Sequence, residues 1–464
     1  MKIFHLLAAC LLIHTAAAAQ QPPNIIFILA DDLGYGNLTS YNPSHKVPTP
    51  HIDQLAKEGT RFTRFYSGSP VCAPSRCALM TGKHMGHAYI RGNAGQALRP
   101  QDTTLAERLR ANGYVTGMFG KWGLGEAGTT GAPEHKGFDA FFGYINQTHA
   151  HHYYTNRLFE IQNGQSVKVP VDTTAYSDEL ILQKALGFIR ENKNKPFFLY
   201  LPLTIPHAEL HVPEPYMQRF RNEDGSSKLG PEMPFVQKGK VTYRSQEQPH
   251  AAFAGMITKL DDDVARVMAL VKELGLDNNT YVFFTSDNGP HREGGADPEF
   301  FNSSGPLRGI KRDLYEGGIR VPMIVRAPGK VPADVVRDDI WAFWDVLPTL
   351  CRLTGTRTPE NIDGLSFTHA LTGKRQPVKH PWLYWQFYEK QYYKEAIVQG
   401  HWKLVRLKKA DQPETVELYD LSSDTGETRN LAATQPAKVK ELLAVARQAK
   451  TPAENKAFQW PGTE

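Results

Sequence analysis

One apolar segment near the N-terminus sets the strongest constraint on the fold. Residues Asn24-Ile-Ile-Phe-Ile-Leu-Ala30 form a nearly continuous apolar run that is rich in isoleucine. Such a run is typical of a strand that is buried on both faces of a parallel sheet. Comparable runs are found at residues 114–119, 197–203, 281–285 and 321–325.

Helix signals alternate with these runs. Thr49-Pro50 supplies an N-cap and an early proline, and Thr104-Leu-Ala-Glu107 is typical of a capping box. Further helices are expected around residues 178–190 and 251–274, and glycines end three of the four at Gly59, Gly113 and Gly275. The alternation predicts the α/β fold class, with a doubly wound, mostly parallel sheet flanked by helices.

The C-terminal part of the chain has a different pattern. Short strands are expected at residues 382–388, 396–398, 402–406 and 416–419, followed by a helix at 437–448. This predicts a small antiparallel sheet with a terminal helix. The expected division is a signal peptide at residues 1–19, a main α/β domain at 20–365 and a C-terminal subdomain at 366–464.

Three local predictions follow from the same pattern. The acidic run Asp261-Asp-Asp263 is expected on a solvated or capping face of its helix. The aromatic stretch 382–388 is expected to belong mostly to the core. Four basic residues are expected on an exposed sheet edge, where charges discourage pairing between chains, namely Lys403, Arg406, Lys408 and Lys409.

The first nineteen residues predict export. A basic start at Met1-Lys2, an apolar run at residues 3–13 and alanines at 16–19 have the pattern of a secretory signal peptide. Leu7-Ala-Ala-Cys10 resembles a bacterial lipoprotein box, so lipid anchoring at Cys10 is the alternative to cleavage near Ala19. We therefore expect a periplasmic or secreted protein. No other run reaches the eighteen or so apolar residues of a transmembrane helix.

Charge and cysteine content narrow the function. The net charge of +5 over 464 residues gives no argument for nucleic-acid binding, although it would not repel an anionic substrate. Without the signal peptide three cysteines remain, and three thiols cannot form a disulfide framework. Cys77 and Cys351 are expected to be buried thiols. Cys72 requires another explanation.

Two of the expected strands end in acidic or amide pairs. Asp31 and Asp32 follow the first strand, and Asp287 and Asn288 follow the strand at 281–285. Ligands of open α/β sheets bind beyond the carboxyl ends of the strands. Oxygen-bearing groups at that edge suit a hard divalent cation, although a single Asp pair is also typical of a loop cap.

The segment around Cys72 carries a family signature. Cys72-Ala-Pro-Ser-Arg76 is followed by Leu79-Met-Thr-Gly82, and every fixed position resembles the C-x-P-S-R signature of type I sulfatases, members of the alkaline phosphatase superfamily. The resemblance implies that a maturation enzyme oxidises Cys72 to formylglycine, an aldehyde whose hydrate is the nucleophile. It also implies that Arg76 holds the hydrate or a metal ligand.

The resemblance extends over roughly residues 22 to 450. Gly120-Lys121-Trp122 is similar to the second signature of the family, whose lysine binds sulfate, and Pro206-His207 to the segment with a catalytic histidine. Arg308-Gly-Ile-Lys311 is similar to the segment with the second sulfate-binding lysine. The implied metal is Ca²⁺, held by Asp31, Asp32, Asp287 and Asn288, and this oxygen set would also accept Mg²⁺.

The chemistry of a sulfate ester agrees with these residue types. The ester is an anion, so a divalent metal, Lys121 and Lys311 would neutralise its oxygens as the sulfuryl group is transferred. His207 would protonate the leaving alcohol.

One position departs from the family pattern. The family has a histidine after Lys121-Trp122, where this chain has Gly123. Candidates to replace it are His84, His87, His149, His151 and His152. The cluster Asn146-Gln-Thr-His-Ala-His-His152 is also compatible with a second metal site, but a sugar-contacting loop is favoured, with His149 and His151 as substrate-binding residues.

The favoured function is therefore the removal of sulfate from a sulfated carbohydrate. The overall resemblance to bacterial glycan sulfatases implies galactose or N-acetylgalactosamine units. A general arylsulfatase, a phosphate or phosphonate monoester hydrolase on the same scaffold and a non-catalytic binding protein are the alternatives. The expected partners are the sulfated carbohydrate and the maturation enzyme.

Overall fold

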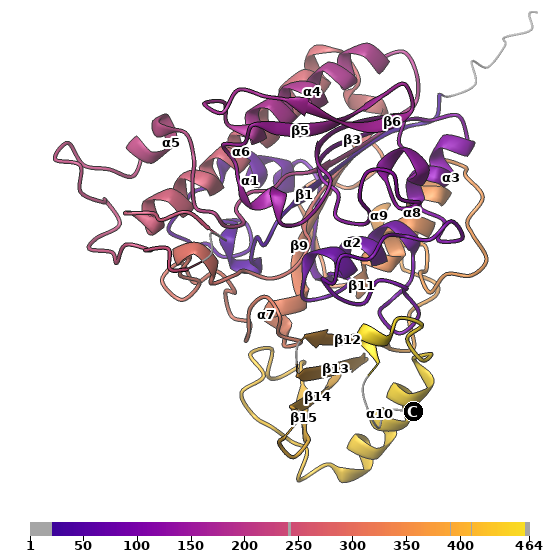
Figure 1. Cartoon of the computed structure of the whole chain (residues 1–464). Coiled ribbons are helices and arrows are strands. Elements are labelled where there is room, and N and C mark those ends of the chain that lie inside the picture. Colours follow the sequence, from indigo (N-terminus) through magenta and orange to yellow (C-terminus); the bar gives the residue numbers. More distant parts are fainter. Residues whose placement is uncertain (1–20, 240–242, 390, 410, 460–464) are drawn as a thin grey trace, which may run out of the picture.

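The computed structural model describes residues 21–239, 243–389, 391–409 and 411–459 (Figure 1). The expected signal peptide, with Cys10, lies outside the described residues. Within the described ranges, no helix combines the length and the apolar character that a membrane crossing requires.

An eleven-stranded mixed sheet forms the centre of the molecule, in the order β10-β2-β9-β8-β1-β7-β3-β4-β5-β6, with β11 paired to β2. The strands β8, β1, β7, β3 and β4 are parallel to one another, so the expected mostly parallel sheet is confirmed. The strand bounds are β1 Asn24–Ala30, β2 Thr60–Tyr66, β3 Val115–Lys121, β4 Ala140–Tyr144, β5 Arg157–Gln162, β6 Gln165–Pro170, β7 Phe197–Pro202, β8 Thr280–Ser286, β9 Arg320–Arg326, β10 Val335–Arg337 and β11 Trp341–Ala342.

Helices cover both faces of this sheet. Every residue of β1 is buried, and its side chains alternate between two separate hydrophobic cores, as a strand with a two-residue period requires. One core packs against α1, α4, α5 and α6, and the other against α2, α3, α8 and α9 (Figure 1). The helix bounds are α1 Pro50–Lys57, α2 Cys72–Thr81, α3 Leu105–Ala111, α4 Ser177–Asn192, α5 Glu214–Gln218, α6 Pro249–Glu273, α7 Glu316–Ile319, α8 Val346–Leu353, α9 Thr368–Leu371 and α10 Pro436–Gln448.

The local helix predictions have mixed outcomes. The capping box is confirmed, because Thr104 Oγ1 accepts from the Glu107 amide at 3.2 Å and Glu107 Oε2 accepts from the Thr104 amide at 2.7 Å. Asp261 does act as a cap, since its carboxylate accepts from the amides of His51 and Ile52 at the start of α1. The prediction that Asp263 is solvated is wrong, because Asp263 is buried and forms an ion pair with Lys259.

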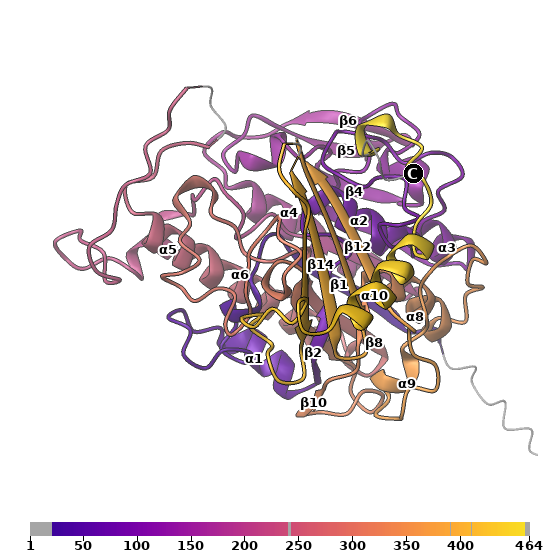
Figure 2. The same cartoon turned by 90° about the horizontal axis from the view of Figure 1, so that it is seen from below.

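The C-terminal sheet consists of β12 (Leu383–Glu389), β13 (Tyr392–Gln399), β14 (Trp402–Lys409) and β15 (Thr415–Asp420), in that order and antiparallel. One face joins the core of the main sheet, and the other packs against α10. Figure 2 shows this sheet and α10 together on the underside of the molecule. The expected antiparallel sheet, helix and largely buried aromatic stretch at 382–388 are confirmed.

The expectation of an exposed charged edge at Lys403 is wrong. The strand β14 lies between β13 and β15, and Lys403 is fully buried. Its Nζ lies 2.9 Å from Glu316 Oε1 in α7 and 2.9 Å from Glu427 Oε1. Glu316 also accepts from Tyr66 OH and pairs with Arg320. These partners lie far from Lys403 in the sequence, so the local pattern could not indicate them.

Removing the Lys403 charge should therefore destabilise the whole fold. We expect Lys403→Met to lower the free energy of unfolding by about 3–5 kcal/mol, because it leaves two buried carboxylates without their shared cation. The control Lys408→Met, at a partly exposed position of the same strand, should change it by less than about 0.5 kcal/mol. Denaturant unfolding of both variants measures this, and similar losses in the two would contradict the buried-charge account.

Candidate active site

Four oxygen-bearing side chains meet at the carboxyl edge of the main sheet. In the β1–β8 pairing, Ala30 lies opposite Ser286, so the residues that follow the two strands lie side by side. The Asp32 amide donates to Asp287 Oδ1 at 3.1 Å, and Asn288 Nδ2 donates to Asp32 Oδ1 at 2.6 Å. Asp31, Asp32, Asp287 and Asn288 are all fully buried.

Three cations balance the three carboxylates. Lys121 Nζ, at the end of β3, lies 2.7 Å from Asp31 Oδ2, and Lys311 Nζ lies 2.7 Å from Asp32 Oδ2. Arg76 donates to Asp287 Oδ2 through Nε at 3.1 Å and Nη2 at 2.8 Å. Each carboxylate is therefore paired with a charge from a different segment of the chain.

The pKa values of these carboxyls reflect the crowding. Burial alone would raise the pKa of Asp31, but the charges of Lys121 and Arg76 outweigh it and hold that pKa well below its ordinary value. Burial and the nearby Asp31 charge raise the pKa of Asp287 to about 7. A further positive charge at this point would therefore favour the ionised form of Asp287.

The donor set fits a hard divalent cation. Three carboxylates and one amide converge, and the Asn288 Oδ1 atom is buried with no hydrogen-bond partner among the described residues. Oxygen donors of this kind are the ligands that Ca²⁺ and Mg²⁺ prefer. These four residues could therefore hold such an ion.

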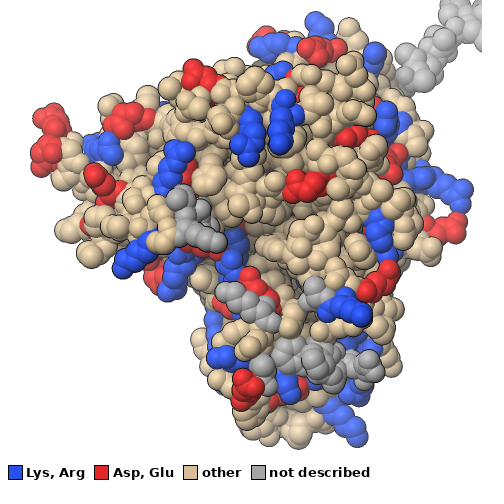
Figure 3. All heavy atoms as spheres, viewed as in Figure 1, with Lys and Arg blue, Asp and Glu red and all other residues tan. Residues whose placement is uncertain are grey.

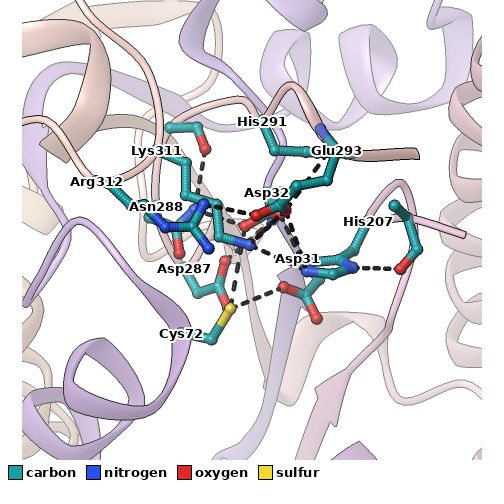
Figure 4. A network of polar contacts seen from close by, with 12 residues as sticks. Asp31, Asp32, Cys72, His207, Asp287, Asn288, His291, Glu293, Lys311 and Arg312 are labelled. Atoms are coloured by element: carbon teal, nitrogen blue, oxygen red, sulfur yellow. Dashed lines mark hydrogen bonds and ion pairs between the residues drawn. The ribbon is translucent and has the colours of Figure 1, made fainter. Parts of the chain in front are cut away.

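Cys72 is the first residue of α2 and points into the same cluster (Figure 4). Its Sγ lies 3.4 Å from Asp31 Oδ1, and burial followed by the Asp31 charge raises the pKa of the thiol well above its usual range. Ser75 Oγ donates to the Asp287 carbonyl at 2.6 Å, and Arg76 Nη1 donates to the Lys121 carbonyl at 2.7 Å. The Ser and Arg of the motif thus fasten α2 to the ends of β8 and β3.

His207 follows β7 and faces Lys311. Its Nδ1 donates to the Ala208 carbonyl, which leaves Nε2 to accept from Lys311 Nζ at 3.0 Å. His207 Nε2 also lies 3.4 Å from Asp32 Oδ2. Burial and the Lys311 charge lower the pKa of His207 well below its ordinary value, so the imidazole is neutral.

Two further imidazoles enclose the His207 ring. His151 stacks on it with ring centroids 4.9 Å apart and planes at 11°, and His291 stacks with centroids 5.4 Å apart and planes at 20°. Glu293 lies 3.1 Å from Lys311 Nζ and also pairs with Arg312. His291 and Glu293 were not predicted from the sequence, although they lie only a few residues after Asp287 and follow the carboxyl end of β8.

The other candidate histidines lie elsewhere. His149 Nε2 is bonded to Thr155 Oγ1 at 2.9 Å, and His152 lies 3.4 Å from Glu209. His84 and His87 both face Asp363. Among the five histidines considered as replacements at Gly123, His151 is the one that the described structure brings to the site, together with Cys72, Arg76, Lys121, His207, Lys311, Asp31, Asp32, Asp287 and Asn288.

Figure 3 shows Lys and Arg interspersed with Asp and Glu over the face that it displays. The described residues on this face therefore form no large region of a single charge.

Comparisons with known proteins point to one family. The family model described as Sulfatase matches residues 23–356, and the model described as N-sulphoglucosamine sulphohydrolase, C-terminal, matches residues 310–450. N-acetylgalactosamine-6-sulfatase of Canis lupus familiaris is 32% identical over 389 residues, which cover 77% of this chain and 67% of the relative.

Two further similarities span almost the whole chain. N-acetylgalactosamine-6-O-sulfatase of Bacteroides thetaiotaomicron is 29% identical over 514 residues, covering 93% of this chain and 94% of the relative. The crystal structure of Ps i-CgsB in complex with k-i-k-neocarrahexaose has a TM-score of 0.78 and 27% identity, covering 95% of each chain. Both the main sheet and the C-terminal sheet therefore have counterparts in these proteins.

Proposed function

The chain belongs to the sulfatase family and is a sulfuric ester hydrolase, and on this premise we propose that its substrate is a sulfated carbohydrate. The observation that carries the proposal is the pair of buried lysines, Lys121 and Lys311, on either side of the Asp31–Asp32 cluster next to Cys72. An anionic ester requires such positive charges at its non-bridging oxygens.

Cys72 would be the residue that a maturation enzyme converts to formylglycine. When present, this group supplies a hydrated aldehyde whose hydroxyl attacks sulfur. Its location at the N-terminus of α2 suits this role, because helix N-termini favour developing negative charge. Arg76 acts as a positioning residue: its contacts with Asp287 and the Lys121 carbonyl fix α2 relative to both strands.

His207 would protonate the leaving alcohol. His207 Nδ1–H donates a hydrogen bond to the Ala208 carbonyl. The proton that can be transferred to the alcohol is therefore the one taken up at Nε2. In the free protein burial and then the Lys311 charge oppose that protonation by lowering the pKa of His207. A bound ester anion would draw the Lys311 charge toward itself and favour the imidazolium.

The proposed cation is Ca²⁺, held by Asp31, Asp32, Asp287 and Asn288, with Mg²⁺ as the alternative. When bound, it would supply charge that stabilises the oxygens of the sulfuryl group. The protein residues contribute the oxygen donors and keep water away from them by burial.

We further propose that the chain is exported through a signal peptide at residues 1–19 to the periplasm or the exterior. Polymeric sulfated carbohydrates are expected there, and the N-terminal pattern in the sequence supports this location.

The preferred sugar is proposed to be galactose or N-acetylgalactosamine. Two of the similar proteins are named for sulfate removal from N-acetylgalactosamine, and the Ps i-CgsB crystal contains a neocarrahexaose. A panel of 6-sulfated galactose, N-acetylgalactosamine and N-acetylglucosamine, with an aryl sulfate and an aryl phosphate, tests this by sulfate or phosphate release. We expect one galactose-type sulfate to react fastest. Activity on the aryl phosphate alone would overturn the proposal.

Cys72→Ser should abolish repeated turnover. A serine sulfate has no second hydroxyl to expel the sulfate, so we expect at most about one desulfated alcohol released per protein molecule, with the sulfate left on the serine. The matched control Cys77→Ser changes a buried thiol outside the cluster and should retain turnover. Sustained turnover by Cys72→Ser would refute the formylglycine mechanism.

Removal of the metal should destabilise the protein. After dialysis against a chelator, Ca²⁺ added at about 100 times its Kd should stabilise the fold by about 2.7 kcal/mol. Asn288→Leu removes one oxygen donor at similar volume and should largely abolish this gain, whereas Asp363→Asn, far from the cluster, should preserve it. Thermal unfolding measures both, and an undiminished gain in Asn288→Leu would show that the ion binds elsewhere.

A further inference from the structure

A cavity lies beside the helix turn that carries Cys72. Its volume is about 220 Å³, and Ala73, the residue after Cys72, forms part of its wall. The other walls come from the ends of three loops, at residues 90–96, 123–126 and 145–148. None of the described residues that line it is Lys, Arg or His, so it differs chemically from the cationic cluster.

The Gln147 side chain can lie against residue 123 because residue 123 is glycine. Gly123 has a φ of +79°, in the region that favours glycine, and a Cβ placed there would lie 1.9 Å from Gln147 Nε2. The Gln147 amide therefore occupies the space in front of residue 123. Its loop is held there by backbone bonds from Trp122 to Tyr144 at 2.9 Å and from Gly123 to Ile145 at 3.1 Å.

Two residues of the cavity wall each carry one amide atom without a hydrogen-bond partner among the described residues. Gln147 Nε2 and Gln96 Oε1 are both buried, and neither makes a hydrogen bond within the described part of the chain. A buried polar atom without a partner is costly, so a ligand that supplies the missing bonds would be favoured. The Gln147 atom is a donor and the Gln96 atom is an acceptor, and a hydroxyl group can bond to either kind.

The remaining polar groups favour a neutral ligand. Glu126 lies at the rim and accepts from Asn146 Nδ2 at 3.3 Å. Its carboxylate can accept from hydroxyls but repels an anion, and none of the described lining residues carries a positive charge that would offset this repulsion. Asn93 Oδ1 accepts from the Ala73 amide at 3.1 Å, which connects the cavity wall directly to the helix turn that carries Cys72.

We infer that this cavity is a subsite for an uncharged sugar ring of the substrate, read through its hydroxyls by Gln96 and Gln147. The inference rests on the proposed carbohydrate sulfatase function and deepens it. It implies a substrate in which the ring held here carries neither a carboxylate nor a second sulfate. The sulfate group would thus be bound at the cluster that contains Lys121 and Lys311, and the sugar ring would be recognised in the uncharged part of the adjoining cavity.

Substitutions of similar size test the subsite. Gln147→Leu and Gln96→Leu should each lower kcat/KM on a sulfated galactose disaccharide by about 3- to 10-fold, the loss of one neutral hydrogen bond. Hydrolysis of 4-nitrophenyl sulfate, which has no second ring, should stay within about 2-fold. Gln54→Leu, on the exposed side of α1, is the matched control. Glu126→Gln should raise relative activity on a disaccharide containing a uronic acid by about 2- to 5-fold.

Failure of the proposed subsite can be distinguished from failure of the proposed sulfatase function. Equal losses on both substrates, or no loss on the disaccharide, would overturn the subsite while leaving the sulfatase function intact. If the wild-type protein releases sulfate from no ester, the proposed function fails. Calorimetric titration with unsulfated galactobiose then tests the subsite by itself. Saturable binding that is weakened in Gln147→Leu supports the subsite, and absence of binding overturns it.

Discussion

Three carboxylates that are buried at one point of the sheet edge constrain the positions of the elements around them. The parallel pairing of β1 with β8 brings Asp31, Asp32 and Asp287 together at the sheet edge, where they would repel one another without compensation. Lys121, Lys311 and Arg76 supply that compensation from β3, from the loop before α7 and from α2. Because each cation comes from a different element, the charge balance also fixes where those elements lie.

The C-terminal sheet contributes contacts to the segment that carries Lys311. The segment that carries Lys311 continues to Arg312, which pairs with Glu389 of β12 at 3.0 Å, and the Arg312 carbonyl accepts from Lys394 of β13 at 2.8 Å. Five residues after Lys311, Glu316 is held by buried Lys403 of β14. A small sheet far along the chain therefore sets the position of one of the two proposed sulfate-binding lysines.

Some of these features could be predicted from the sequence, and others could not, for physical reasons. The central parallel strands are buried on both faces, so β1, β7 and β8 are visible as continuous apolar runs. The strand β2 contains two arginines among its apolar residues and was not predicted. The residues at strand ends were found because sheet topology alone brings them together, whereas Lys403 was misjudged because its partners are set only by tertiary packing. His149 and His151 are two residues apart in one short turn, and only the fold decides that His151 stacks on His207.

The formal charge of the site explains why an anion should enter it. Asp31, Asp32 and Asp287 carry three negative charges when ionised, and Lys121, Lys311 and Arg76 carry three positive ones. The protein alone is thus near neutrality at this point, and a divalent cation in the oxygen set would leave an excess of two positive charges. In a buried pocket such an excess is poorly screened, so an anionic ester would relieve it. The adjoining amide-lined cavity has no such excess, and so only the sulfated end of a substrate would be drawn to the nucleophile.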